Sequence, residues 1–437
     1  MMREARALPG REYAANWRLR LGIAGCALAL ALGSWAFAPL AVAQDGKPAA
    51  PSVRNAIGMP IEAALAALKQ KHGKEALARI AEADATKDKT PYETYVVERI
   101  RAQALVLLGD AAGAASAFEK AVSSSGAPAA DKLPLLAAAT SQYFAAKAYA
   151  KTVELADRYV RDGGTEKSVR TLLIHSLYLG NDFVRATKEI AADVQSEEQA
   201  GRIPSEEQLQ LLANTTLKQR DNAGYAQVLE KLLAYHPKKD YWLGVIHGVQ
   251  THAGFPGRLT LDLARLKIAT GTMRSANEYV EAAQLSLQEG FPAEAGRIID
   301  QGYAARLLGT GAEAERHKRL RAMATKNLAE DRRTAAQDDA QAAAATNGVA
   351  LFNAGFNHVF KGSFDKGLDM MERGLGKGGL KRADDSRLHL GYAFYLAGRQ
   401  QKAAETFKAV QGQNGAAALA RLWVIHIGHK APPRPRS

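Results

Sequence analysis

The stretch Leu388–Val410, LHLGYAFYLAGRQQKAAETFKAV, predicts two short amphipathic helices joined by a tight turn. Apolar and small residues recur at steps of three and four on both sides of Gly398, which is the spacing of one helix face. Gly398 supplies the turn, because glycine reaches positive φ at no steric cost. The stretch therefore predicts a helical hairpin.

The same hairpin recurs along most of the chain. The preceding copy, Ala354–Leu375, aligns without a gap and places Gly355 at the position of Gly391 and Gly367 at that of Ala403. Because glycine inside a helix costs about 1 kcal/mol relative to alanine, its recurrence predicts two helices in close approach. The predicted turns lie at Gly73, Gly109, Lys147, Asn181, Arg220, Gly254, Gly290, Gly362 and Gly398, with one turn absent near Asn327.

These turns are 34 to 39 residues apart, with one interval of 72 across the absent turn. A period of this length without strand patterns is the sequence sign of an α-solenoid. We therefore expect an all-α superhelix of about ten helix-turn-helix repeats. Such folds bind partners on an extended concave surface, so the pattern favours a binding protein over an enzyme.

The repeat resembles the tetratricopeptide repeat (TPR) family between Ile61 and Gln411. The matching residues are a small residue in the first helix, a turn, then alanine and a large apolar residue: Gly391, Gly398, Ala403 and Phe407, with Pro237 as a closing proline. The match is weak between Asp131 and Pro237. The family's signature tryptophan is mostly missing, with Trp242 the one match. The resemblance implies a protein-binding scaffold without cofactor.

The predicted turns and the local composition divide the chain into the following expected segments. Residues 1–43 form a signal peptide, 44–55 a flexible lead, 56–311 TPR-like repeats, 348–412 two regular repeats, and 413–437 a final helix with a basic disordered tail. Residues 312–347, rich in charge and alanine, are a degenerate helical unit or a hinge; the alternative is a linker that makes the last two repeats a separate domain.

A basic start precedes an uncharged, largely apolar run from Leu21 to Ala43, and Ala41-Val42-Ala43 fits a small-x-small cleavage site. We therefore expect export to the periplasm of a Gram-negative bacterium. An uncleaved anchor in the inner membrane is the alternative, because the run is long enough to span a bilayer. Cleavage would remove Cys26, the sole cysteine, and with it all thiol chemistry.

Charge and motifs narrow the function classes. The net charge of +13 falls to +10 without the five arginines and two glutamates of residues 1–43, and acids interleave with bases along the chain. Nucleic-acid binding is not expected, because no binding motif accompanies this charge. No histidine cluster, phosphate loop or nucleophile elbow is recognisable, so we expect neither a metal nor a cofactor nor catalysis. A glycosidase of the helical-toroid type is set aside because aromatic residues make up only 7% of the chain.

We therefore expect a non-enzymatic scaffold that binds a protein or peptide on its concave face in the bacterial envelope. Tyr241-Trp242, followed by a hairpin and the stretch Glu278–Gly302, EYVEAAQLSLQEGFPAEAGRIIDQG, faintly resembles repeat proteins of TonB-type transport. An envelope-assembly factor for cell wall or outer membrane is the alternative, and a peptidoglycan-active enzyme with a helical solenoid is the least favoured. The candidate contact residues are apolar positions in the first helix of each of the last two predicted hairpins: Phe352, Phe356, Val359, Phe360, Leu388, Tyr392 and Tyr395.

Overall fold

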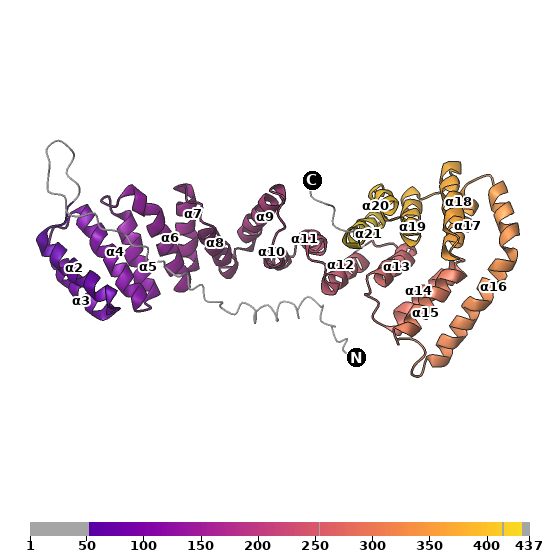
Figure 1. The fold of residues 1–437 in the computed structure, drawn as a ribbon, viewed down its shortest axis with the longest axis horizontal. Helices are drawn as coiled ribbons and strands as arrows, with labels where there is room; N and C mark the ends of the chain where they lie inside the picture. The colour runs from indigo at the N-terminus through magenta and orange to yellow at the C-terminus, as the bar shows by residue number, and fades with distance from the viewer. Residues whose placement is uncertain (1–51, 253, 413–414, 431–437) are drawn as a thin grey trace. The chain divides into compact units, whose positions relative to one another are not determined.

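The computed structural model describes residues 52–252, 254–412 and 415–430. These residues form twenty α-helices and one short 3₁₀ turn, and no strand (Figure 1). The predicted signal peptide, residues 44–51 of the lead and the basic tail from residue 431 on lie outside the described residues. The all-α prediction is confirmed.

The helices follow one another with short connections. The first nine are α2 (Asn55–Lys69), α3 (Gly73–Asp84), α4 (Pro91–Leu107), α5 (Ala111–Ser123), α6 (Ala129–Ala145), α7 (Tyr149–Arg161), α8 (Lys167–Leu179), α9 (Phe183–Gln199) and α10 (Glu206–Lys218). Then come α11 (Asn222–Tyr235), α12 (Lys239–Thr251), η1 (Gly257–Leu259), α13 (Thr260–Ala269), α14 (Ala276–Gln288) and α15 (Pro292–Ala304). The last are α16 (Ala314–Ala344), α17 (Val349–Phe360), α18 (Phe364–Lys377), α19 (Ala383–Leu396), α20 (Gln400–Lys408) and α21 (Ala416–Lys430).

One turn geometry joins the two helices of nearly every hairpin. A single residue takes a positive φ, and the N–H of the next residue bonds to the carbonyl five positions earlier, which closes the helix end as a Schellman motif. For example, Gly109 has φ 76° and the Asp110 N–H donates to the Leu105 carbonyl at 3.0 Å. This geometry recurs with Lys71, Gly109, Lys147, Asn181, Arg220, Gly290, Gly362 and Gly398 as the left-handed residue.

The predicted series of turns at regular intervals is confirmed with two corrections. Gly73 is not the left-handed residue of the first hairpin: it begins α3, and Lys71 takes φ 63° instead. A Cβ on Gly73 would lie 2.9 Å from the Leu108 side chain, so helix contact explains this glycine. Near Asn327 there is no turn at all, because α16 continues as one helix of 31 residues. The described residues therefore contain nine hairpins, the single helix α16 and the final helix α21.

The predicted close approach at paired glycines is confirmed in the α17–α18 hairpin. A Cβ built on Gly355 would lie 2.6 Å from the Gly367 carbonyl oxygen, and one on Gly367 would lie 2.6 Å from the Gly355 carbonyl oxygen. Two turns further along α18, a Cβ on Gly374 would meet the backbone of Phe352 at 2.7 Å. Backbone therefore packs directly on backbone, which only glycine permits.

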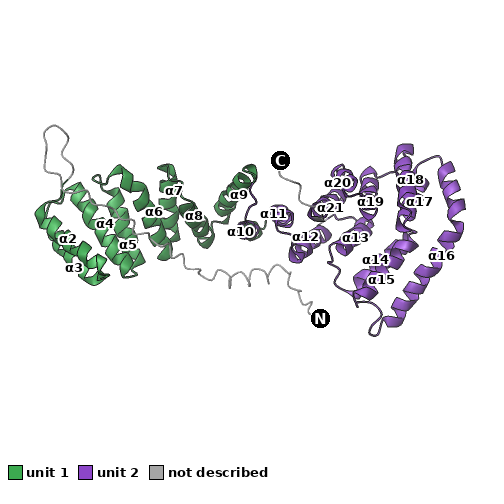
Figure 2. Ribbon diagram, viewed as in Figure 1, with its two compact units in different colours: residues 1–201, 214–221 green, residues 202–213, 222–437 purple. Residues whose placement is uncertain are grey.

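The chain divides into two compact units, and the division falls within α10 (Figure 2). Unit 1 comprises the described residues up to Gly201 together with Asn214–Asp221, and unit 2 comprises Arg202–Ala213 and Asn222 onward. The last two hairpins, which follow α16 in the chain, belong to the same unit as α13–α15, which precede it.

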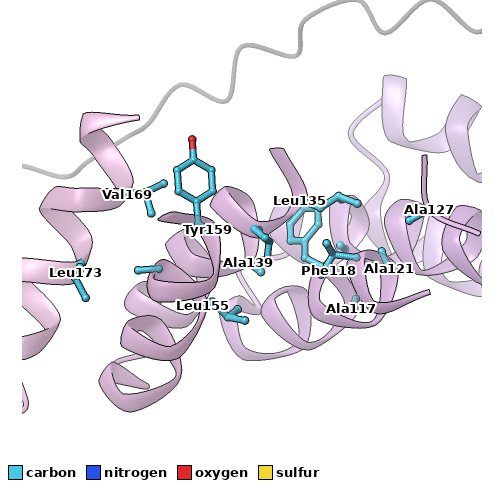
Figure 3. Packing of buried hydrophobic residues seen from close by; sticks show 14 of the residues in the cluster. Ala117, Phe118, Ala121, Ala127, Leu135, Ala139, Leu155, Tyr159, Val169 and Leu173 are labelled. Atoms are coloured by element: carbon cyan, nitrogen blue, oxygen red, sulfur yellow. The ribbon is translucent and has the colours of Figure 1, made fainter. Parts of the chain in front are cut away.

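Unit 1 is a stack of hairpins. The second helix of each hairpin packs against the first helix of the next: α3 on α4, α5 on α6 and α7 on α8. Its core is continuous from α4 to α9, and Figure 3 shows Phe118, Leu135, Leu155 and Val169 from successive helices within it. Each hairpin buries its apolar face on its neighbours, as repeat proteins do.

Unit 2 closes on itself. Helix α16 contacts α14, α15 and α17, and after it the chain returns so that α21 packs on α11 and α13. The sequence predicted a superhelix with an open concave face; in unit 2 the C-terminal helices instead cover the interior face of the earlier ones (Figure 2). The closing contacts include the Arg258 guanidinium with the Asp385 carboxylate at 2.7 Å and the His429 ring nitrogen with the Leu233 carbonyl at 2.5 Å.

We predict that Gly367→Ala destabilises the protein by about 1–2 kcal/mol, because the strain of overpacking exceeds the gain in helix propensity. Gly376→Ala is the matched control. Gly376 lies in the same helix, is exposed, and a Cβ there would meet nothing within 4 Å, so the change should be neutral or stabilising by up to about 1 kcal/mol. Urea unfolding followed by circular dichroism measures both. Equal stability of the two variants would contradict the packing explanation.

Candidate functional site

The structure places most of the predicted contact residues in the interior of unit 2. Phe352, Phe356, Val359, Phe360 and Leu388 are at most 4% exposed, and Tyr392 and Tyr395 are half-buried. Val359 and Phe352 pack within their own hairpin, beside Gly367 and Gly374. A partner could reach these side chains only if unit 2 opened, so their role in partner binding stays a prediction.

Four of the predicted residues meet other rings in one continuous aromatic cluster. The members of this aromatic cluster are Trp242, Phe291, Phe356, Phe360, His389, Tyr392, Tyr395, Phe407, Trp423 and His426. Ring centroids are 4.5 Å apart for Phe356–Phe360, 5.3 Å for Tyr392–Trp423 and 5.9 Å for Trp242–His426. The cluster thus joins α12, α15, α17, α19, α20 and α21. The low aromatic content of the chain conceals this concentration, because composition carries no information on where the rings meet.

At the centre of the aromatic cluster lies a buried arginine. The Arg265 guanidinium donates from Nε and Nη2 to the two Glu294 oxygens at 2.7 and 2.8 Å, and from Nη1 to Asp262 at 2.7 Å. Phe356 and Tyr392 present their rings to the guanidinium at 5.1 and 5.3 Å, within the range of cation–π attraction. All three charged side chains are at most 5% exposed, and each has partners.

The neighbours of this ion cluster complete its hydrogen bonding. The Ser286 hydroxyl donates to Glu294 at 2.9 Å, and His389 Nε2 lies 3.1 Å from an Asp262 oxygen. Arg265 therefore links α13 to α15, and through its neighbours it reaches α14 and α19. A buried charge retained with complete partners fixes the mutual register of these helices, because any shift would leave a charge unpaired.

The electrostatics of the site follow from this geometry. Burial alone would raise the pKa of the Asp262 carboxyl, but the adjacent His389 and Arg265 outweigh it and lower this pKa to about 2. Burial would likewise lower the pKa of the Arg265 guanidinium, and the charge of Glu294 reverses this and raises it. For Tyr392, burial followed by the charge of Glu294 raises the pKa of the phenol. These are the shifts of a satisfied ion cluster.

Sequence reasoning did not find Arg265, Asp262, Glu294 or Phe291. One signal was present: Asp262 and Arg265 are three residues apart in the otherwise apolar stretch LTLDLAR, so both charges must lie close to the buried face of α13. No residue-level pattern links them to Glu294, which lies on another helix.

Unit 1 exposes large apolar side chains to solvent, unlike the buried cluster of unit 2. Large apolar side chains stay in solvent where successive hairpins turn, and we name these residues the turn edge: Leu107, Leu108, Leu179, Val184 and Leu217. Val184 is 70% exposed. The α8/α9 turn is a neighbour of the α6/α7 and α10/α11 turns, because Gly180 lies beside Tyr149 and the Gln219 amide donates to the Phe183 carbonyl at 3.0 Å. The α4/α5 turn packs on the preceding hairpin through the contact of Leu108 with Gly73.

The described residues hold no group of three or more His, Cys, Asp or Glu side chains placed to bind a metal ion. None of their helices combines the length and the apolar character needed to cross a membrane. A shallow open depression of 460 Å³ in unit 1 is lined by polar side chains, among them Lys89, Lys120 and Ser124.

No family model and no curated protein matches the chain. Among solved structures it is similar to the complex of Naa15/Naa10 bound to HypK-THB, with 15% identity over 82% of this chain, 57% of that chain and a TM-score of 0.28. It is also similar to the TPR2AB domain of yeast Sti1 in its pHSP90 complex (11%, 68% and 99%, TM-score 0.23) and to yeast Tom70 (10%, 86% and 96%, TM-score 0.24).

The chain thus spans little more than half the length of the first of these structures. At these TM-scores the similarities carry no argument about arrangement or function. The hairpins themselves define the class: the described residues form an all-α protein of repeated helical hairpins.

We predict that Arg265→Met destabilises the protein by about 3–5 kcal/mol, because it leaves Glu294 and Asp262 as buried charges without their partner. Arg333→Met is the control, since the Arg333–Glu330 pair is exposed and such pairs contribute at most about 1 kcal/mol. In the chain from Gln44 onward, the tryptophans are Trp242 and Trp423 of unit 2, so denaturant unfolding followed by tryptophan fluorescence reports on that unit. A variant as stable as the control would show that the cluster does not hold the unit together.

The lowered pKa of Asp262 predicts acid sensitivity of unit 2. The pKa is about 2 in the folded protein and about 3.9 in an unfolded chain, so the stability from its ionised form is present above pH 4. This stability is lost as the pH falls from 4 towards 2. Asp262→Asn removes the group, and its unfolding free energy should therefore fall less steeply over this interval. Parallel curves for wild type and variant would contradict this origin of the acid sensitivity.

Proposed function

We propose that the protein is a non-enzymatic scaffold that binds a protein partner along the turn edge of unit 1. The observation that carries the proposal is the concentration of exposed leucine and valine side chains at three turns of one stack: α4/α5, α8/α9 and α10/α11. Two of these turns, α8/α9 and α10/α11, are adjacent in the stack, and large apolar side chains gathered on an exposed surface are typical of interaction sites.

The spacing of the turns constrains the partner. Neighbouring packed helices lie about 8–10 Å apart, so apolar anchors that contact the successive turns α8/α9 and α10/α11 must be separated by a similar distance, and an anchor at α4/α5 lies two hairpins away from α8/α9. An extended segment rises about 3.3 Å per residue and would place an anchor at every third residue. We therefore propose an extended peptide or loop with apolar residues at this interval as the bound element.

The burial of the aromatic cluster in unit 2 supports a binding surface in unit 1. Its equivalent interior side chains are buried by its own C-terminal helices, so its aromatic cluster contributes stability rather than an open groove. The proposal therefore moves the expected contact from the last two hairpins to unit 1. It retains protein binding, the function class that repeat stacks serve.

The cellular setting remains a proposal that rests on the sequence of residues 1–43. We propose export to a bacterial periplasm with cleavage before Gln44, the alternative being an uncleaved inner-membrane anchor, and action within a TonB-type transport system or, alternatively, in cell-wall or outer-membrane assembly. N-terminal sequencing of the protein from fractionated cells tests the first part. Recovery of TonB and its motor proteins, or of assembly machinery, distinguishes the two pathways.

We predict that Leu179→Lys with Val184→Lys abolishes partner capture, because two lysines replace apolar contact area at one turn. The control is Val160→Lys, which changes a similarly exposed valine of unit 1 (48% exposed) near the end of α7, away from the turn edge. Affinity capture from envelope extract with quantitative mass spectrometry should show one protein retained by wild type and control and lost from the double variant. Equal capture by all three would refute the turn edge as the binding surface.

A further inference from the structure

Helix α2 is the first helix of the described part of unit 1 (Figure 1), and its outer face differs in exposure from the matching face of α4 in the next hairpin. The left-handed residues Lys71 and Gly109 set the register, so Met59 and Ala66 of α2 correspond to Val97 and Ala104 of α4. Val97 and Ala104 are buried in the core formed with α2 and α3. Met59 is 71% exposed and Ala66 is also exposed.

This comparison shows what α2 lacks. In α4, the face is covered because the second helix of the preceding hairpin, α3, packs on it. Helix α2 has the same kind of face, with a large apolar residue and a small one two turns apart, but no helix of the described residues covers it. The face therefore has the side-chain pattern of a helix-packing surface and is exposed. Repeat stacks ordinarily end in a helix with a polar outer face.

Charged side chains at the border of this face identify the occupant. Glu62 and Lys69 are seven residues apart, so they lie two turns apart on the same flank of α2. Both are exposed, and neither forms an ion pair or hydrogen bond within the described residues. Ala66 lies between them, and its small side chain permits close approach of another helix.

We propose that this face binds a second copy of the chain, with the two α2 helices packed antiparallel about a two-fold axis. Such an axis brings the same flank of both helices together and reverses their direction. If it passes between residues 65 and 66, Glu62 of each copy faces Lys69 of the other. The arrangement forms two equivalent ion pairs and covers Met59 and Ala66 in both copies, which makes the face self-complementary as an isologous interface requires.

The self-complementary charge favours a second copy over an unrelated partner. An acidic partner would match Lys69 and oppose Glu62, and a basic partner would do the reverse. Helix α2 has 15 residues, or about 22 Å of length, and one such helix pair buries less than the 1,200–2,000 Å² of a standard interface. The dimer is therefore weak, with a dissociation constant on the order of 10–100 μM, and depends on concentration.

Charge exchange in the full chain tests the proposal. Glu62→Lys and Lys69→Glu each replace two attractions by two repulsions and should weaken self-association about tenfold or more. An equimolar mixture of the two variants restores both attractions and should form a 1:1 heterodimer with nearly the wild-type constant. Sedimentation equilibrium from about 1 to 200 μM spans the expected range.

Two further variants separate packing from charge and from general surface effects. Ala66→Arg keeps Glu62 and Lys69 but blocks close approach, and should also give monomer. Lys74→Glu on the exposed face of α3 makes the same charge change as Lys69→Glu outside the proposed interface, and should leave association unchanged. Circular dichroism confirms that each variant is folded, which is expected because every changed side chain is in solvent.

A wild-type chain that stays monomeric throughout this range would overturn the proposal. So would a dimer that Glu62→Lys leaves unchanged, as expected if residues preceding α2 cover the face or if association uses another surface. Capture of a partner by the turn edge of unit 1 is scored separately, so neither result decides the other.

Discussion

The left-handed residue between paired helices is the constraint on which the rest of the structure depends. Once its φ is positive, the helix end is closed by a bond to the carbonyl five positions back, and the next helix must run antiparallel. Four of these residues are not glycine: Lys71, Lys147, Asn181 and Arg220. The strain of about 1–2 kcal/mol at each is therefore offset by the packing that the turn makes possible.

A repeated turn by itself would give an open stack, as in unit 1. Unit 2 differs because α16 replaces one hairpin by a single helix. Before α16, the second helix of each hairpin (α11, α13 and α15) faces the interior of unit 2. Because α16 is a single helix, the first helix of each later hairpin (α17 and α19) and the final helix α21 face the same interior. Ion pairs between α16 and α17, such as Lys361 with Asp331 at 2.8 Å, hold the long helix in place. The interior of unit 2 is closed because helices from both sides of α16 in the chain face it.

The buried ion cluster then specifies how the interior closes. An apolar interior of phenylalanine, tyrosine and tryptophan could pack in several registers at similar energy. Arg265 allows only the arrangement that gives Glu294 and Asp262 their partners, because an unpaired buried charge costs several kcal/mol. The aromatic cluster supplies the buried area, and the arginine supplies the specificity. Protein binding, as proposed, is left to the stack that does not close.

The sequence by itself determined the hairpin, its period and nearly every turn, because these depend on residues close together in the chain. It also marked Gly355 and Gly367, whose cost in a helix only close packing explains. It did not determine which apolar faces are exposed. Phe356 and Val184 have similar apolar character, yet one is 1% and the other 70% exposed. Only the tertiary structure decided this, since exposure depends on whether distant helices return to cover a face, and that follows from the single helix α16.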